Sequence, residues 1–220
     1  MNIGFLFDWD GVVIDSHLQH RESWDLLAQE MGEALPEVFF VKTFGMRNQN
    51  IIPLWLPRLA ESPAAIIEIG DRKEALYREV LRRDGIEALP GIKAFLQAAR
   101  AAGIPSCVGS STPRQNIETV IEMAGLEGLF DGIVSADDVT NGKPDPEVFL
   151  KAATRVARDP ARCVVFEDAF VGIEAGKRGG MKVVGIATTH PREKLTEADL
   201  VFESLSGVSP LELVKQLGLA

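Results

Sequence analysis

The chain has 220 residues, of which 46% are hydrophobic and 25% are charged, and its formal net charge at pH 7 is -9. This composition is that of an ordinary globular protein, and the length suffices for one large domain or for a core domain with a small companion. The negative charge disfavours nucleic acid and anionic membranes as partners, because an acidic surface repels phosphate groups. An anionic substrate would need a local positive site, which a bound metal ion can provide.

Cysteine content and hydropathy indicate a cytoplasmic protein. The chain has two cysteines, Cys107 and Cys163. Two cysteines do not make a disulfide framework, so we expect buried reduced thiols. No basic segment precedes the first apolar run, and no apolar stretch approaches about 18 residues, so neither a signal peptide nor a membrane span is expected. A monomer is the default expectation, with a weak homodimer as the alternative.

The chain begins with a predicted strand that is followed by a predicted helical insertion. Residues 3–8 form a short apolar run that is typical of a buried strand, and Asp8 lies at its carboxyl end. Residues 16–84 contain several helical patterns, interrupted by prolines, and no convincing strand. We therefore predict a small helical domain over 16–84, inserted into a core domain made of 1–15 and 85–220.

From residue 85 onward, apolar runs alternate with amphipathic stretches. Further strands are predicted at 104–110, 132–135, 163–167 and 183–187. Helices are predicted at 92–102, 114–124, 146–156 and 170–179. This alternation predicts an α/β fold with a doubly wound, mainly parallel sheet that is covered on both faces. Ligands of such sheets bind beyond the carboxyl ends of the strands, so an insertion after the first strand would cover that site like a lid.

Polar residues cluster where the predicted strands end. In chain order these residues are Asp8 and Asp10, then Ser110 and Ser111, then Lys143 in the loop after the third strand, and finally Glu167 and Asp168. Because the carboxyl ends of parallel strands share one edge of the sheet, these side chains should converge there. Thr112 and Arg114 also follow the second strand, and whether they contact a ligand stays open.

The clustered residues are the types that phosphoryl transfer requires. Acids a few ångströms apart cannot all stay ionised without a cation, and oxygen ligands select magnesium over zinc or copper. The hydroxyls of Ser110 and Ser111, the amides of a helix start and Lys143 together make a phosphate cradle. A carboxylate that faces phosphorus can act as a nucleophile, and a second carboxylate two residues on can transfer protons; Asp8 and Asp10 have that spacing.

Four motifs in this order resemble those of the haloacid dehalogenase superfamily, and within it the β-phosphoglucomutase-like phosphatases and mutases. The motifs are Phe-Asp-Trp-Asp-Gly-Val-Val at 7–13, Val-Gly-Ser at 108–110, Gly-Lys-Pro-Asp-Pro at 142–146 and Phe-Glu-Asp-Ala at 166–169. The resemblance implies a Rossmann-like sheet with a helical cap at the position of the predicted insertion.

The resemblance also implies a role for each core residue. Asp8 would be the nucleophile and Asp10 the general acid and base. Ser110 would hold the transferring phosphate, and Lys143 would neutralise charge on the phosphate and on Asp8. The magnesium ligands would be the carboxylates of Asp8, Asp168 and Glu167 and the backbone carbonyl of Asp10.

Substrate contacts from the helical insertion follow from the same resemblance. His20 would contribute to closure of the cap, and Gly45 and Arg47 belong to a segment that resembles the specificity loop of the cap. Phe44 stands where the mutases carry a lysine, which weakens the mutase interpretation. Lys73 either matches another cap lysine of the mutases or is an ordinary exposed lysine of a helix.

The favoured function is therefore a magnesium-dependent phosphatase for a small phosphorylated metabolite, with a sugar phosphate as the expected class. The alternative is a sugar-phosphate mutase of the β-phosphoglucomutase type. A phosphonate-cleaving enzyme and a non-catalytic metabolite-binding protein are less favoured, because the first needs a Schiff-base lysine in the cap and the second would not need the full acidic set. The sequence does not name the substrate.

Overall fold

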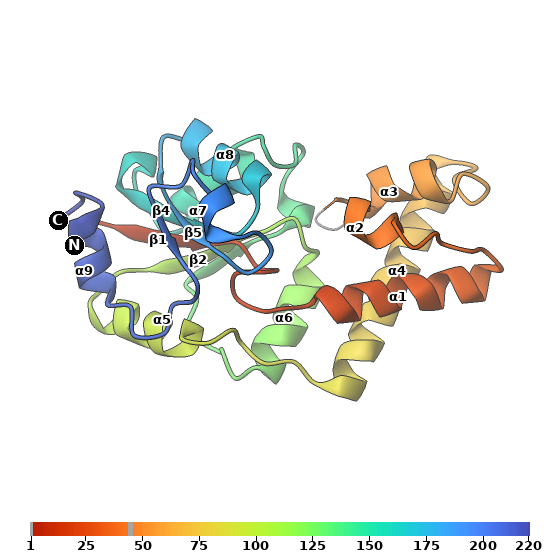
Figure 1. Cartoon of the computed structure of the whole chain (residues 1–220), viewed down its shortest axis with the longest axis horizontal. Coiled ribbons are helices and arrows are strands. Elements are labelled where there is room, and N and C mark those ends of the chain that lie inside the picture. Colours follow the sequence, from red (N-terminus) through yellow and green to blue (C-terminus); the bar gives the residue numbers. More distant parts are fainter. Residues whose placement is uncertain (1, 44–45) are drawn as a thin grey trace. The chain divides into compact units, whose positions relative to one another are not determined.

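The computed structural model describes residues 2–43 and 46–220, which form two compact units (Figure 1). The sheet unit comprises Met1–Asp15 and Glu87–Ala220, and the helical unit comprises Ser16–Ile86. The second boundary lies two residues beyond the one predicted at 84–85. The two units are described separately below.

The sheet unit contains a six-stranded sheet in which neighbouring strands are parallel. Its strands are β1 (Gly4–Phe7), β2 (Ser106–Gly109), β3 (Gly132–Val134), β4 (Cys163–Glu167), β5 (Lys182–Ile186) and β6 (Leu200–Phe202). Their order is β3-β2-β1-β4-β5-β6. The predicted doubly wound α/β fold is confirmed. The sequence analysis missed β6, a half-buried edge strand of three residues between acidic neighbours, which is too short for a periodicity signal.

Helices cover both faces of this sheet (Figure 1). They are α5 (Ile92–Ala101), α6 (Arg114–Met123), α7 (Glu147–Arg155), α8 (Phe170–Arg178) and α9 (Pro210–Gln216), and short 3-10 turns span Ala136–Asp138, Pro160–Arg162 and Arg192–Lys194. Alternate residues of β1 face opposite layers. Leu6 packs in the core layer formed by α7 and α8, whereas the rings of Phe5 and Phe7 contact Phe95 of α5 at centroid distances of 5.4 and 6.2 Å.

The strand order reverses at β1. From β1 the chain proceeds to β2 and β3 on one side, and then returns to β4, β5 and β6 on the other. Such a switch point leaves a crevice at the carboxyl ends of the central strands, where ligands of open α/β sheets bind. The backbone amide of Asp8 still donates to the carbonyl of Phe166 on β4 at 3.0 Å. The ends of β1 and β4 therefore stay side by side as far as Asp8 and Glu167.

The helical unit consists of α1 (His17–Met31), α2 (Phe39–Thr43), α3 (Asn48–Trp55) and α4 (Pro63–Asp84). It has its own apolar core, which includes Trp24, Leu27, Phe39, Ile52 and Leu76. Helix α4 begins at a serine cap followed by proline: the Ser62 hydroxyl accepts from the amide of Ala65 at 3.1 Å. Across the described part of the chain, no helix combines the length and the apolar character that crossing a membrane requires.

Candidate active site

Three carboxylates meet at the carboxyl ends of β1 and β4. Asp8 follows β1, Glu167 ends β4, and Asp168 follows it. One oxygen from each of the three side chains lies within 4.8 Å of the other two. All three residues are buried, with exposed fractions of 9%, 1% and 3%. The predicted convergence of these acids at the edge of the sheet is therefore observed, although their chemical roles stay predictions.

Two glycines make this close approach possible. Gly11 has a φ of +80°, and a β-carbon on it would overlap the carboxylate of Asp168. A β-carbon on Gly172, in the first turn of α8, would overlap the carboxylate of Glu167. The contact between Gly11 and Asp168 depends on the fold, because the two residues are far apart in the chain. Both glycines thus leave space that the acidic side chains occupy.

Lys143 is the counter-charge of the cluster. Its Nζ donates to Asp8 Oδ1 at 2.7 Å and to Glu167 Oε1 at 2.6 Å. The same atom lies 4.8 Å from the centroid of the Phe149 ring on α7, in a cation–π position. Burial alone would lower the pKa of Lys143, but the charges of Asp8 and Glu167 outweigh burial and raise it. The lysine therefore stays protonated and pairs with the predicted nucleophile.

The electrostatics of the cluster favour a further cation. Burial raises the pKa of Asp8 to about 7, against the lowering effect of Lys143, and raises the pKa of Asp168 to about 8, with the charges of Glu167 and Asp8 adding to it. With all three acids ionised, one ammonium leaves an excess of two negative charges. A divalent cation matches this excess, and the all-oxygen donor set suits a hard ion. The residues therefore fit a bound metal ion.

The raised pKa values of Asp8 and Asp168 lead to a prediction for the metal-free protein. The folded state keeps these protons at pH values where the unfolded chain, with an ordinary aspartate pKa of 3.8, has lost them. The free energy of unfolding should therefore fall as the pH rises from about 4 to about 8. Magnesium binds the ionised acids, so it should raise the melting temperature by several degrees, roughly 5–10 °C, at pH 8 and by much less at pH 5. Thermal melts with EDTA and with magnesium at both pH values test this, and an equal shift at both would contradict it.

Ser110, Thr112 and Asp10 form a second group at the same edge of the sheet. Ser110 is buried at the end of β2, and its hydroxyl accepts from the amide of Thr112 at 3.1 Å. The Thr112 hydroxyl donates to the carboxylate of Asp10. Thr112, whose part the sequence left open, thus connects the predicted acid/base to the predicted phosphate-binding serine. Ser111 lies between them in the chain and is partly exposed.

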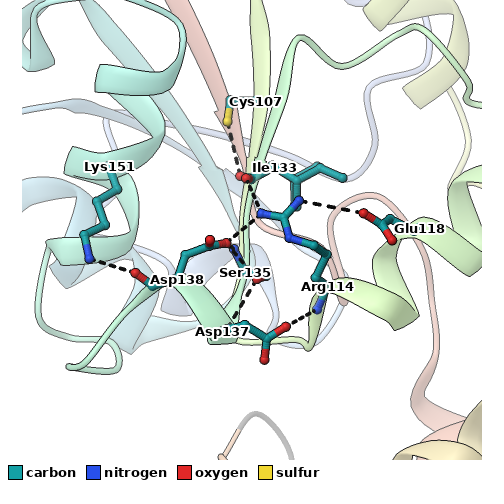
Figure 2. Close-up of polar contacts among 9 residues, drawn as sticks. Cys107, Arg114, Glu118, Ile133, Ser135, Asp137, Asp138 and Lys151 are labelled. Atoms are coloured by element: carbon teal, nitrogen blue, oxygen red, sulfur yellow. Dashed lines mark hydrogen bonds and ion pairs between the residues drawn. The ribbon is translucent and has the colours of Figure 1, made fainter.

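Arg114 has a structural role at the edge strand β3 (Figure 2). Its Nη2 donates to the carbonyl of Ile133 at 3.0 Å and to Asp138 Oδ2 at 2.8 Å, and its backbone amide donates to Asp137. These contacts engage the guanidinium in hydrogen bonds to the β3 region, so the structure gives no support to Arg114 as a phosphate ligand. Edge strands need such covering, because their outward polar groups otherwise pair with other chains.

In the helical unit, His20 belongs to a polar cluster in which Lys73 and Glu74 are buried. Its Nδ1 lies 2.7 Å from Lys73 Nζ, and its ring stacks on Tyr77 with a centroid distance of 3.9 Å. Lys73 is only 2% exposed and donates to Glu74 Oε1 at 3.0 Å. The alternative that Lys73 is an ordinary exposed lysine is therefore wrong. The sequence could not show this, because the partners come from α1 and α4 and meet only on packing.

The structure describes only one of the two remaining residues that were predicted to contact substrate from the helical unit. Arg47 is the N-cap residue of α3, and the next residue, Asn48, donates to Glu74 Oε1 at 2.7 Å. Gly45 and Phe44 lie outside the described residues. Substrate contacts by His20, Gly45 and Arg47 stay predictions.

Two threonines near the carboxylates were missed by the sequence analysis. The Thr189 hydroxyl donates to Asp168 Oδ2 at 2.6 Å, and the Thr188 hydroxyl donates to the backbone carbonyl of Gly11. Both residues follow β5. They could have been found from the same principle as the other site residues, that polar residues after the carboxyl ends of parallel strands converge. The signal at this strand end is weaker than at the others, because residues 187–190 contain no acid.

The fold and the site define an α/β enzyme with a buried acidic centre, which could hold a cation, at the switch point of its sheet. A family model of the haloacid dehalogenase-like hydrolases matches residues 4–180. The chain belongs to this family, as the four motifs predicted.

Curated relatives and solved structures agree with this assignment. Over 219 residues the chain is 33% identical to the chloroplastic 5-amino-6-(5-phospho-D-ribitylamino)uracil phosphatase of Arabidopsis thaliana, covering 97% of this chain but only 57% of that protein. It is 33% identical over 206 residues to hexitol phosphatase A of Escherichia coli K12, covering 94% and 93% of the two chains. The crystal structure of β-phosphoglucomutase from Clostridium difficile is similar with a TM-score of 0.85, at 26% identity, covering 99% of this chain and 98% of the other.

Proposed function

We propose that this protein is a magnesium-dependent phosphatase that hydrolyses a small phosphorylated metabolite through an aspartyl-phosphate on Asp8. The observation that carries the proposal is the Asp8 carboxylate at the end of β1, held by Lys143 at 2.7 Å beside Glu167 and Asp168. The relatives named as phosphatases act on phosphorylated metabolites, which supports the same class of substrate here. A sugar phosphate is the favoured substrate.

Charge neutralisation would come from Lys143 and from magnesium. Asp8, Glu167 and Asp168 would hold the ion, together with the backbone carbonyl of Asp10. When bound, magnesium supplies positive charge that stabilises the phosphoryl oxygens. Lys143 favours the ionised form of Asp8 against the effect of burial and orients its carboxylate, since the lysine ammonium already pairs with Oδ1. Ser110 would donate its hydroxyl to a phosphoryl oxygen.

Two steps complete the proposed reaction. In the first, a carboxylate oxygen of Asp8 attacks phosphorus, the ester bond to the leaving oxygen breaks, and the Asp10 carboxyl gives that oxygen a proton. In the second, water attacks the aspartyl-phosphate, Asp10 takes the proton of the water, and the bond between Asp8 and phosphorus breaks. Inorganic phosphate leaves and Asp8 is regenerated. Thr112, which donates to the Asp10 carboxylate, would orient Asp10 for both transfers.

The helical unit would act as a cap that contributes substrate selectivity, with His20, Gly45 and Arg47 as its contacts. We further propose a cytoplasmic monomer whose partner is the metabolite and which binds neither nucleic acid nor membranes. These points follow from composition and from the family resemblance.

The direct test of the proposal is phosphate release from a panel of sugar phosphates and related metabolite esters, with magnesium and with EDTA. We expect magnesium-dependent release from at least one sugar phosphate. Paranitrophenyl phosphate serves as a generic control for the core chemistry. Absence of release from every ester, with folded protein that binds magnesium, would exclude the phosphatase.

A sugar-phosphate mutase is the second candidate, because a β-phosphoglucomutase is among the similar structures. A mutase would interconvert 1- and 6-phosphates of a hexose and would be activated by the bisphosphate. Phosphate release without isomer formation would exclude this candidate. Formation of the isomer without net phosphate release would exclude the phosphatase instead.

A further inference from the structure

Two adjacent threonines after β5 bind both elements that carry the acidic cluster. Thr189 donates through Oγ1 to Asp168 Oδ2 at 2.6 Å, at the end of β4. Thr188 donates through Oγ1 to the carbonyl of Gly11, in the turn that follows β1. Because β5 lies next to β4 and β4 lies next to β1, one dipeptide connects three neighbouring strand ends.

The contact with Thr189 decides which oxygen of Asp168 is available. Oδ2 is enclosed, since it receives the Thr189 hydroxyl and lies against the Cα of Gly11, where no β-carbon would fit. Because the hydrogen bond and the close approach of Gly11 both involve Oδ2, Oδ1 is the oxygen more available to a metal ion. Rotation of the carboxylate would break the hydrogen bond to Thr189, so the hydroxyl holds the side chain in one orientation.

His190 lies beside this hydrogen bond. Its Nδ1 lies 3.0 Å from Thr189 Oγ1 and 3.3 Å from the backbone carbonyl of Asp168, and its ring packs edge-on against Phe170 at 4.3 Å. A hydroxyl has one proton. An ionised carboxylate can only accept, so the hydroxyl proton is donated to Asp168, and Thr189 Oγ1 keeps lone pairs that face Nδ1. Thr189 Oγ1 also lies 3.1 Å from the Asp168 carbonyl, which is a weaker acceptor than the carboxylate.

We propose that Thr189 is a positioning residue that presents Oδ1 of Asp168 to the metal ion. The inference rests on the proposed function, because it assumes that Asp168 ligates magnesium. Partners that orient a metal ligand in this way typically contribute about ten- to a hundredfold to metal affinity. None of the four family motifs contains Thr189, which lies beyond the residues that the family model matches.

The test is a calorimetric magnesium titration of the full-length protein without substrate. Thr189→Val keeps the shape of the side chain and removes the donor, and it should weaken magnesium binding about tenfold. Thr189→Ser keeps the donor and should bind within about threefold of the wild type. Thr154→Val is the matched control, because that hydroxyl donates to the backbone of α7 and has no link to the cluster; it should bind as the wild type does. In turnover assays, Thr189→Val should raise the magnesium concentration for half-maximal rate more than it lowers the rate at saturating magnesium.

The outcomes separate this inference from the proposed function. Equal magnesium affinity of Thr189→Val and the wild type would overturn the positioning role and leave the phosphatase proposal intact. No magnesium binding by the wild type would overturn both. If Thr189→Val does not fold, as judged by circular dichroism, Thr189→Ala removes the same donor without added bulk and answers the same question. Weak binding by Thr189→Ser, equal to that of Thr189→Val, would also overturn the inference, because the hydroxyl would then not be the cause.

Discussion

Replacement of Asp8 by Asn is expected to lower phosphate release by at least about a thousandfold, because an amide cannot serve as the nucleophile. The fold should survive, since Asn has nearly the same shape and the buried site already raises the pKa of the acid toward 7. Measured rates with a substrate from the panel, together with circular dichroism spectra and melting temperatures, test both parts. No phosphoenzyme should be trapped from the variant when the reaction is quenched with acid.

Asp159→Asn is the matched control for this experiment. Asp159 is an exposed aspartate that accepts from the amide of Ala161 at the start of a short turn, and its loss should leave turnover unchanged. If the Asp8→Asn variant hydrolyses substrate at the rate of the wild type, Asp8 is not the nucleophile. Loss of turnover in both variants would indicate a general effect on folding.

Replacement of Lys143 by Met is expected to affect both stability and activity. The ammonium is buried between Asp8 and Glu167, so its removal takes the cationic partner away from two buried carboxylates. Breaking a buried ion pair by removing one partner costs about 3 kcal/mol or more of unfolding free energy. Turnover should fall by about a hundredfold or more, because one of the two positive charges near the phosphoryl group is lost. Urea unfolding and steady-state kinetics give the two quantities.

The loss of stability in Lys143→Met should depend on pH. Near pH 5 the carboxyl of Asp8 is protonated in the folded protein, since burial raises its pKa to about 7, so less charge is left unpaired and the destabilisation should be smaller than at pH 8. Lys215→Met provides the control: this lysine is exposed on α9 and pairs with Glu212, and it should contribute within about 0.5 kcal/mol. A destabilisation equal at both pH values would show that Lys143 acts through packing and not through its charge.

The sequence alone determined the order of β1 to β5 and the position of the site along the chain. Apolar runs between amphipathic stretches predicted β1 to β5, because buried parallel strands are continuously apolar. The acids, hydroxyls and lysine at the ends of these runs had to meet, because parallel strands place their carboxyl ends at one edge. Asp8, Lys143, Glu167 and Asp168 were therefore predictable from local pattern and topology. The helical insertion was predictable for a similar reason, since 16–84 lacks any strand pattern.

Only the tertiary structure decided which polar side chains act together across distant parts of the chain. Thr189 contacts Asp168 and Thr188 contacts Gly11, yet neither threonine belongs to a motif of charged residues. Lys73 has the spacing of a surface lysine but is buried beside His20, because α1 and α4 pack against each other. Sequence patterns report periodicity and composition, whereas such contacts depend on the packing of side chains that are far apart in the chain. The acids of the cluster and Lys143 were therefore visible in the sequence, and the threonines that contact Asp168 and Gly11 were not.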